Sequence, residues 1–431
     1  MRYLIFLVVP LLSLQNLIDK IPKGPTGINF QNLMLLGMFA AWLVVRRRRG
    51  GPMVVKNPIS APLIVYIVLT FLGMWQAAFF LDIDLPVTLS DPHVTFWKDY
   101  FTTMMFFFFA QGIFDEEREM EWMMFAMAAI LPYMFRVHYS QYMDASAWHY
   151  SHDMRVKGTF THLGSNELAA FYTQYGLLFM CLAAGLKKRW KKLVFAAAFG
   201  FCLWGTVYSY SRGAWMALAL GIVLYGFIKS RALVVAMIGF ALIAPAILPA
   251  SITDRAEMTQ SGGGELDSSA ASRIDFWKLA WDYFLDYPIT GIGYHAFHHV
   301  NPAGLDTHNM YVKQMAELGI LGIALYLALY VIAMAVALRL YRIGDTPFLR
   351  SMGLGLFMCI LASMVLNIFG DRFSYTALST FYWVLLGMAV RAIYLVRNRP
   401  PPVVDDDEDD DASAEINGPQ QPRRRASIFA P

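Results

Sequence analysis

The chain has 431 residues, of which 57% are hydrophobic and only 16% are charged, and its formal net charge is +3. So few charged residues could not cover the surface of soluble domains, and a chain this apolar would not stay disordered. The composition therefore excludes a soluble globular protein and a disordered protein for most of the chain. With a mean hydropathy of +0.44, the composition predicts an all-α polytopic membrane protein. Lipid admits only helices or closed barrels, and the apolar runs show no strand-like alternation.

About twelve apolar runs approach the roughly 20 residues that a membrane-spanning helix needs. They lie at 3–18, 28–45, 59–80, 96–113, 122–139, 165–186, 193–210, 213–229, 232–249, 315–338, 351–369 and 376–396. Alternate connections are rich in Lys and Arg, beginning with Arg46–Arg49. The positive-inside rule predicts that these connections are cytoplasmic, and an even number of spans would place both termini on that side.

We expect four regions. Residues 1–250 would hold nine transmembrane helices with a periplasmic loop near 140–164, and 250–314 would form a large, partly helical periplasmic loop. Residues 315–396 would hold three more spans, and 397–431, with its acidic run, would be a disordered cytoplasmic tail. Loops as long as the second periplasmic one are uncommon without a function.

Candidate phosphate-binding arginines border the outer helix ends. Arg136 comes first in the chain, and Arg212 follows in the short Ser-Arg-Gly joint between two apolar runs. An arginine at such a place is costly unless it meets water or an anion. A lipid phosphate and a diphosphate held in a pocket both fit the planar guanidinium fork. Position alone does not choose between them.

Helical periodicity reappears inside the second outer loop. Arg273, Trp277 and Trp281 follow one another at four-residue spacing, on one face of a predicted helix. Pro288 and nearby glycines then break the pattern. Trp277 could stack on a sugar ring, although the aromatic belt at a membrane interface also accounts for tryptophan here.

His308 is the candidate general base. It precedes an apolar run, and the dipole at a helix N-terminus disfavours a protonated imidazole. Asn309 could cap or orient this end, while Glu317 could instead be the structural partner of a buried arginine. Arg372 follows the eleventh run and is a further outer cation, although such residues often only snorkel to the interface.

All nine histidines fall in predicted outer regions, which favours an outward-facing active site, although the longer outer loops also collect more polar residues. His149 with His152, and His295 with the His298-His299 pair, have spacings that metal sites use. No cysteine and no full carboxylate set completes either group. We therefore expect no metal site, and we expect the three cysteines, all in apolar runs, to be core residues.

Three segments, in this order, resemble the bacterial O-antigen ligase and polymerase superfamily. They are Ser211-Arg212-Gly213, then Ser272-Arg273…Trp277 leading to Pro288…Gly291-Ile292-Gly293, and finally His308-Asn309…Glu317-Leu318-Gly319-Ile320. The stretch from Gly158-Thr159-Phe160 to Asn166-Glu167-Leu168-Ala169 is also similar to the family's segment before its middle spans.

The resemblance implies a membrane glycosyltransferase of the GT-C type in the bacterial inner membrane. Such an enzyme moves a glycan from undecaprenyl diphosphate to an acceptor hydroxyl, here lipid A core, at the periplasmic face. Carried over by motif, Arg212 and Arg273 would hold the diphosphate and His308 would be the base, while Arg372 and Arg136 match by location only. From the resemblance we expect arginines to stabilise the leaving group without a metal or other cofactor, and the anomeric centre to invert.

Three other functions remain open at this stage. A polymerase would use another lipid-linked repeat as acceptor and shares the donor end of the site, and attachment of the glycan to protein is a third, smaller possibility. A lipid-linked glycan transporter is less favoured, because the apolar runs contain little internal charge and no matching interrupted pair. Besides membrane lipids and the two substrates, no partner is expected, and the +3 charge does not call for nucleic acid.

Overall fold

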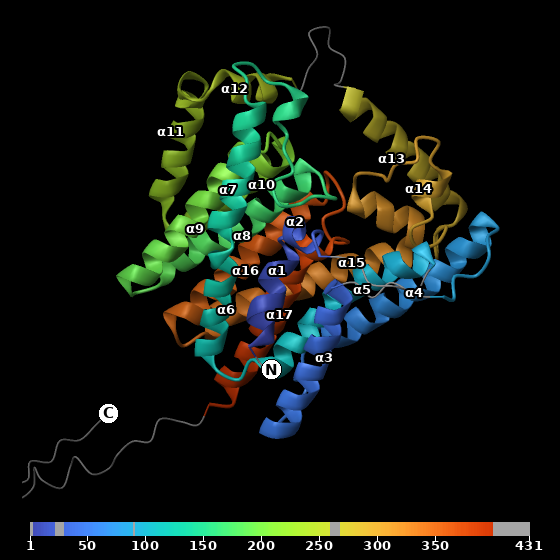
Figure 1. Ribbon diagram of the computed structural model, residues 1–431, viewed down its shortest axis with the longest axis horizontal. Helices are drawn as coiled ribbons and strands as arrows, with labels where there is room; N and C mark the ends of the chain where they lie inside the picture. The colour runs from blue at the N-terminus through green and yellow to red at the C-terminus, as the bar shows by residue number, and fades with distance from the viewer. Residues whose placement is uncertain (1–2, 22–29, 89–90, 259–267, 400–431) are drawn as a thin grey trace, which may run out of the picture. The chain divides into compact units, whose positions relative to one another are not determined.

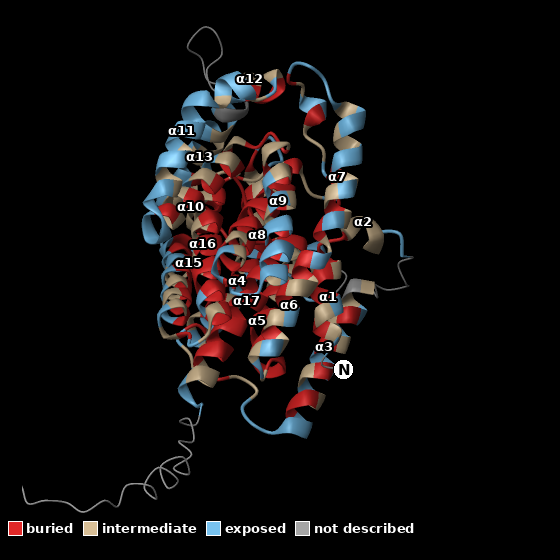
Figure 2. Ribbon diagram, turned by 90° about the vertical axis from the view of Figure 1, so that its left-hand side faces the viewer, coloured by how far each residue is buried: buried red, intermediate tan, exposed pale blue. Residues whose placement is uncertain are grey.

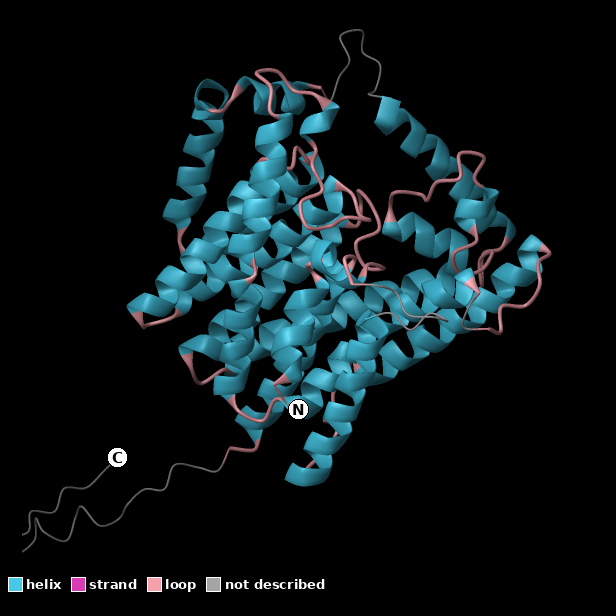
Figure 3. Ribbon diagram, viewed as in Figure 1, coloured by secondary structure: helices cyan, strands magenta, loops and turns pink. Residues whose placement is uncertain are grey.

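The computed structural model describes residues 3–21, 30–88, 91–258 and 268–399, and within these ranges every regular element is helical (Figures 1 and 3). The chain divides into two units, residues 1–396 and 397–431. The predicted tail beyond residue 399 lies outside the described residues. The α-helices are α1 (Leu4–Leu12), α2 (Gln15–Ile18), α3 (Phe30–Arg49), α4 (Ser60–Leu81), α5 (Pro92–Ile113), α6 (Glu117–Ala129), α7 (Leu131–Ala145), α8 (Ser165–Gly185), α9 (Arg189–Val207), α10 (Arg212–Lys229), α11 (Arg231–Ile247), α12 (Ala250–Glu257), α13 (Ser268–Asp286), α14 (Phe297–Val300), α15 (Met310–Ile343), α16 (Pro347–Leu366) and α17 (Thr376–Arg397).

Helix starts follow local sequence signals. The Asp91 carboxylate accepts from the backbone N–H of His93 at 2.8 Å, and Pro92 occupies the first turn of α5. Thr346 caps α16 in the same way, with its hydroxyl 3.2 Å from the N–H of Leu349. Such residues satisfy backbone donors that the helix itself leaves unpaired. The sequence therefore sets where these helices begin.

Burial separates central from peripheral helices (Figure 2). Most of α8, α16 and α17 is buried, and the cysteines at 181, 202 and 359 are buried free thiols, as predicted. In contrast, α11 has no buried residue although it is strongly apolar, and Leu242 is 79% exposed. An exposed apolar helix of this kind is compatible with lipid, and it supports an integral membrane protein.

Six helices in the described ranges are long and apolar enough to cross a membrane, or seven if the bent pair α11–α12 counts as one span. The six are α4, α8, α10, α15, α16 and α17. The other predicted runs also contain helix, but several are interrupted or charged. The run 122–139 is split at Ile130 between α6 and α7, and α9 begins with three basic residues in its first four. The helical membrane class is confirmed, and the number twelve stays a prediction.

Asp115 forms ion pairs with basic residues from distant parts of the chain. Its carboxylate lies 2.5 Å from Arg46 and from Arg391, and 2.7 Å from Arg49. Nearby, Glu117 accepts from the Thr346 hydroxyl at 2.7 Å. Three connections that were predicted to be cytoplasmic, together with the last turns of α17, therefore lie at one end of the bundle. The assignment of that end to the cytoplasmic side stays a prediction from the positive-inside rule.

The first turns of α15 are joined to the segment 288–294. Gly319 breaks the helix with φ +62°, and the segment satisfies the backbone groups that the break exposes. Ile292 and Gly293 donate to the carbonyls of Ala316 and Glu317 at 2.9 and 2.8 Å, while the N–H of Ile320 donates to the Pro288 carbonyl at 2.9 Å. The N–H of Tyr294 then donates to Gly73 of α4 at 2.8 Å. This junction positions the loop that continues toward His308.

We predict that Gly293→Ala destabilises the protein by roughly 3 kcal/mol or more. Gly293 has φ +108°, and an added Cβ would lie 2.2 Å from the backbone nitrogen of Ala77. Overpacking and a strained backbone each cost about 1–3 kcal/mol. Gly200→Ala is the control, because no atom lies within 4 Å of its added Cβ. Thermal unfolding of the two variants in detergent measures the difference, and similar midpoints would contradict the prediction.

Candidate active site

His308 lies in the turn that leads into α15, in a backbone conformation unusual for its residue type. Its φ is +52°, in the left-handed region. On one side the Thr307 hydroxyl donates to the Asn309 carbonyl at 2.8 Å, and on the other the N–H of Met310 donates to the Asn367 carbonyl at 2.8 Å. Asn309 caps α15 by accepting from Tyr311 and Val312, as its position predicted. Strain held in this way is common at functional sites.

Helix α13 supports the same turn, since α13 packs on α15. The indole Nε1 of Trp277 donates to the Thr307 carbonyl at 2.9 Å, and the ring centroids of Phe276 and His308 are 6.4 Å apart. Trp281, on the same predicted face, is 49% exposed and carries no comparable contact to this turn. Trp277 therefore positions the His308 turn through a hydrogen bond.

Two of the predicted arginines lie near enough to His308 for their charges to act on its imidazole. Burial lowers the pKa of the His308 imidazole below its usual 6.5, and the positive charges of Arg273 and Arg372 lower it further. Asp306 and Glu167 act in the opposite direction. The net direction agrees with the neutral base expected from the sequence, but the main causes are burial and arginine charge. A neutral imidazole flanked by guanidinium groups can accept a proton beside a bound anion.

Arg372 is buried in the connection between α16 and α17. Its Nη1 pairs with Glu167 at the start of α8, and its Nη2 donates to the Phe369 carbonyl at 3.3 Å. Its backbone N–H donates to the Asn367 side chain at 2.9 Å. The Nε is buried, and no hydrogen-bond partner for it is found in the described part of the chain. A buried guanidinium donor of this kind suits an anionic ligand.

Arg212 lies at the first position of α10, where the short joint was predicted, and is partly buried. The next residue, Gly213, packs so closely on Phe369 that an added Cβ would lie 2.7 Å from the ring. Phe369 is the residue whose carbonyl holds Arg372. The joint with Arg212 therefore packs against the connection that carries Arg372.

An ion triad centred on the buried Lys313 lies beside His308, and no sequence pattern predicted it. Lys313 of α15 lies 2.6 Å from Asp306 and 3.2 Å from Asp371. Burial alone would raise the pKa of the Asp371 carboxyl, but Lys313 and hydrogen bonds from Ser374 and Phe373 hold it below its usual value. A lysine in the first turn of an apolar run was the available signal, because a buried ammonium needs a partner.

Glu317 and Arg136 differ from the other predicted site residues. The Glu317 carboxylate is buried and accepts from the Phe297 backbone N–H at 3.4 Å, and the cation whose charge acts on it most strongly is Lys313, not an arginine. It therefore supports the segment around Phe297. Arg136 is exposed on α7, and it is not among the charges that act most strongly on His308. No contact places it in this group.

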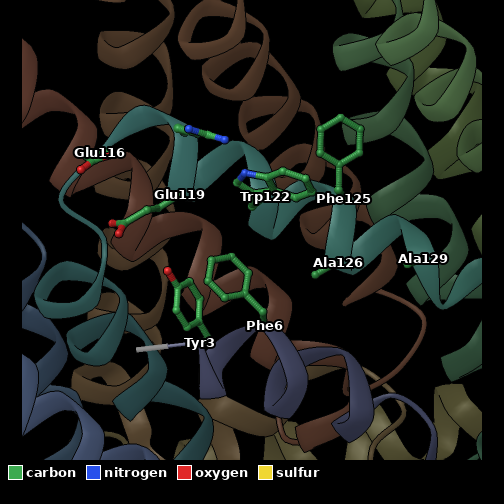
Figure 4. Close-up of a pocket in the computed structure, with 9 residues that line it drawn as sticks. Tyr3, Phe6, Glu116, Glu119, Trp122, Phe125, Ala126 and Ala129 are labelled. Carbon is green, nitrogen blue, oxygen red and sulfur yellow. The ribbon is translucent and has the colours of Figure 1, made fainter. Parts of the chain in front are cut away.

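A pocket of about 650 Å³ lies elsewhere, between α1 and α6 (Figure 4). Tyr3, just before α1, and Phe6 of α1 face Trp122 and Phe125 of α6, with Glu119 near the edge. Its lining includes none of the residues around His308. Aromatic walls suit an apolar chain better than a diphosphate, so this pocket is not the candidate active site.

Residues 197–327 match the family described as O-antigen ligase. The matched stretch includes Arg212, Arg273 and His308, so the resemblance to this superfamily is confirmed over that part of the chain. No curated protein matches the chain. With its apolar helices, the family match indicates an integral membrane protein with activity of the O-antigen ligase or polymerase type.

We predict that Lys313→Met destabilises the protein by about 3–5 kcal/mol, because it leaves two carboxylates without their buried cation. Lys278→Met is the matched control, since its pair with Asp275 is exposed on both sides and should be worth less than about 1 kcal/mol. Adding Asp371→Asn to Lys313→Met should recover part of the loss. Thermal unfolding measures all three variants, and equal shifts for the two lysine variants would refute the role of the triad.

Proposed function

We propose that this protein is a membrane glycosyltransferase of the O-antigen ligase type. It transfers a glycan from undecaprenyl diphosphate to an acceptor hydroxyl, with lipid A core as the acceptor, at the periplasmic face of the bacterial inner membrane. The observation that carries this proposal is that the charges of Arg273 and Arg372 act on His308, with His308 and Arg273 inside the stretch 197–327 that matches O-antigen ligase. A base beside two guanidinium groups is the set that this reaction requires.

The roles follow from the charge changes in the reaction. The acceptor oxygen attacks the anomeric carbon, and the His308 imidazole takes the proton of that hydroxyl. The bond from the anomeric carbon to the diphosphate oxygen breaks, and its electron pair leaves with the diphosphate. Arg273, Arg372 and Arg212 stabilise this growing negative charge, while Trp277 and Asn309 hold the turn that carries His308. A single displacement inverts the anomeric centre.

Fixed arginines can supply the charge that Mg²⁺ supplies in other phosphate-transfer sites, so we expect transfer without added Mg²⁺ or Mn²⁺. The donor diphosphate already is a good leaving group and needs no protonation. Arg136 is exposed on α7, and we assign it at most an outer contact with the lipid-linked donor.

His308→Ala should lower the transfer rate by about 100- to 10,000-fold, which is the usual contribution of a general base. The assay combines purified protein with undecaprenyl-diphosphate glycan and candidate acceptors, and detects the product on gels. His152→Ala is the control, because His152 is exposed in a separate loop. Full transfer activity in His308→Ala would show that His308 is not the general base.

The pH profile of kcat/KM tests whether the protonation state of His308 controls the activity. Protonation inactivates the base, and since the pKa of His308 lies below 6.5, activity should stay flat at neutral pH and fall only on further acidification. Arg273→Gln removes a charge that lowers this pKa, so the acid limb should move upward. Lys278→Gln, exposed on the same helix, should leave the limb in place. If Arg273→Gln left the acid limb at the same pH, the proposed influence of the Arg273 charge on the His308 base would be wrong.

The acceptor separates the ligase from a polymerase of the same superfamily. Product on lipid A core supports the ligase, whereas growth of the lipid-linked glycan with no transfer to core would identify a polymerase. Either product keeps the roles of His308 and the arginines, because these groups act on the donor end and on the attacking hydroxyl.

A further inference from the structure

Four histidines meet outside the proposed catalytic group. Three come from the segment that follows the α15 junction: His295, and the pair His298 and His299 on α14. One ligand atom from each of the three lies within 4.8 Å of the others. The ring centroids of His298 and His299 are 3.8 Å apart, and those of His295 and His298 are 4.6 Å apart.

The fourth histidine, His93, comes from the first turn of α5. Its ring stacks at 5.3 Å on His299 and lies 6.5 Å from His295. The Nδ1 of His93 lies 3.3 Å from the Asp91 carboxylate. A carboxylate on one ring nitrogen fixes the tautomer and leaves the other nitrogen as a free electron-pair donor, as is common for metal-bound histidines.

Several of these ring nitrogens are buried, and no hydrogen-bond partner for them is found among the residues that the structure describes. They are Nε2 of His93, Nδ1 of His295 and Nδ1 of His298. Unpaired buried nitrogens are costly, and so many in one place point to a ligand that accepts their lone pairs.

The surrounding structure holds this cluster in place. His295 has φ +64°, and the rings of His295 and Phe96 stack at 3.8 Å. Glu317 accepts from the N–H of Phe297, and Tyr294 is anchored to Gly73 of α4 at 2.8 Å. These contacts give Glu317 a role that the sequence did not indicate, which is to position the histidine-bearing segment.

We propose that His295, His298 and His299 bind one divalent transition-metal ion, typically zinc, with His93 as the fourth ligand. Tetrahedral zinc with Zn–N bonds of about 2.1 Å needs nitrogens about 3.4 Å apart, so modest side-chain rotations would close the site. His299 is exposed and can make such a rotation. Imidazole ligands also suit Ni²⁺, Cu²⁺ and Co²⁺, while Mg²⁺ and Ca²⁺ prefer oxygen ligands.

The ion would join α5 to the segment that runs from the α15 junction to His308, and so it would brace the loop that carries the proposed base. No step of glycan transfer passes through it. The expectation of no metal site rested on the lack of a completing ligand near these histidines in the sequence. The fold supplies that ligand from α5.

The test uses the full chain, purified in detergent without a polyhistidine tag and stripped with a chelator. Zn²⁺ is titrated in competition with a chromogenic chelator, and Co²⁺ absorption reports the coordination geometry. Wild type should bind one Zn²⁺ per chain, and His298→Ala/His299→Ala should weaken binding by at least about 100-fold. The control His149→Ala/His152→Ala removes two exposed histidines and should bind as wild type does.

Equal affinity in the two double variants, loss of binding only in His149→Ala/His152→Ala, or no saturable binding would overturn the proposal. Zn²⁺ should also raise the unfolding midpoint of wild type and of the control, and not that of His298→Ala/His299→Ala. If that double variant does not fold, the single change His299→Gln at the exposed position gives the same comparison. His308→Ala should keep its zinc, which separates this site from the proposed base.

Discussion

The candidate site depends on the ion pairs that the buried Lys313 ammonium forms with two carboxylates. The ammonium holds Asp306, in the loop just before His308, and Asp371, in the connection that carries Arg372. A charge buried in this way is tolerated only when its partners are close and well placed. The pairing therefore sets the position of a candidate base relative to a candidate phosphate-binding arginine, although Lys313 itself need not touch the substrate.

The break in α15 at Gly319 has a similar organising effect. Membrane-embedded backbone must satisfy its hydrogen bonds internally, and here the segment 288–294 provides the partners. The chain that leaves this junction carries the three clustered histidines, and it ends at His308. One irregularity in a spanning helix thus positions the segment that carries both the proposed metal site and the proposed base.

Local sequence signals predicted the local structure well. Asn309 caps α15, the Ser-Arg-Gly joint stays short, and the cysteines are core residues, because each depends only on nearby residues or on the apolar character of its own run. Predictions that needed a neighbour from elsewhere were less complete. The charges of Arg273 and Arg372 act on His308, whereas Arg136 is exposed on α7. Glu317 supports the backbone at Phe297, where an arginine partner was considered. The number of spans also depends on interruptions, such as the one at Ile130, that composition does not show.

By itself, the sequence determined that the protein is a helical membrane protein, and its motifs pointed to the O-antigen ligase superfamily, because apolar composition and short ordered motifs can be read along the chain. Only the tertiary structure decided which polar side chains share an environment. His93 reaches His299, Glu167 reaches Arg372, and Asp371 reaches Lys313 across large separations in the chain. Buried polar groups need hydrogen-bond or ion-pair partners, and the packing of the helices determines which residues serve as partners. The spacing of residues in the sequence does not show which ones these are.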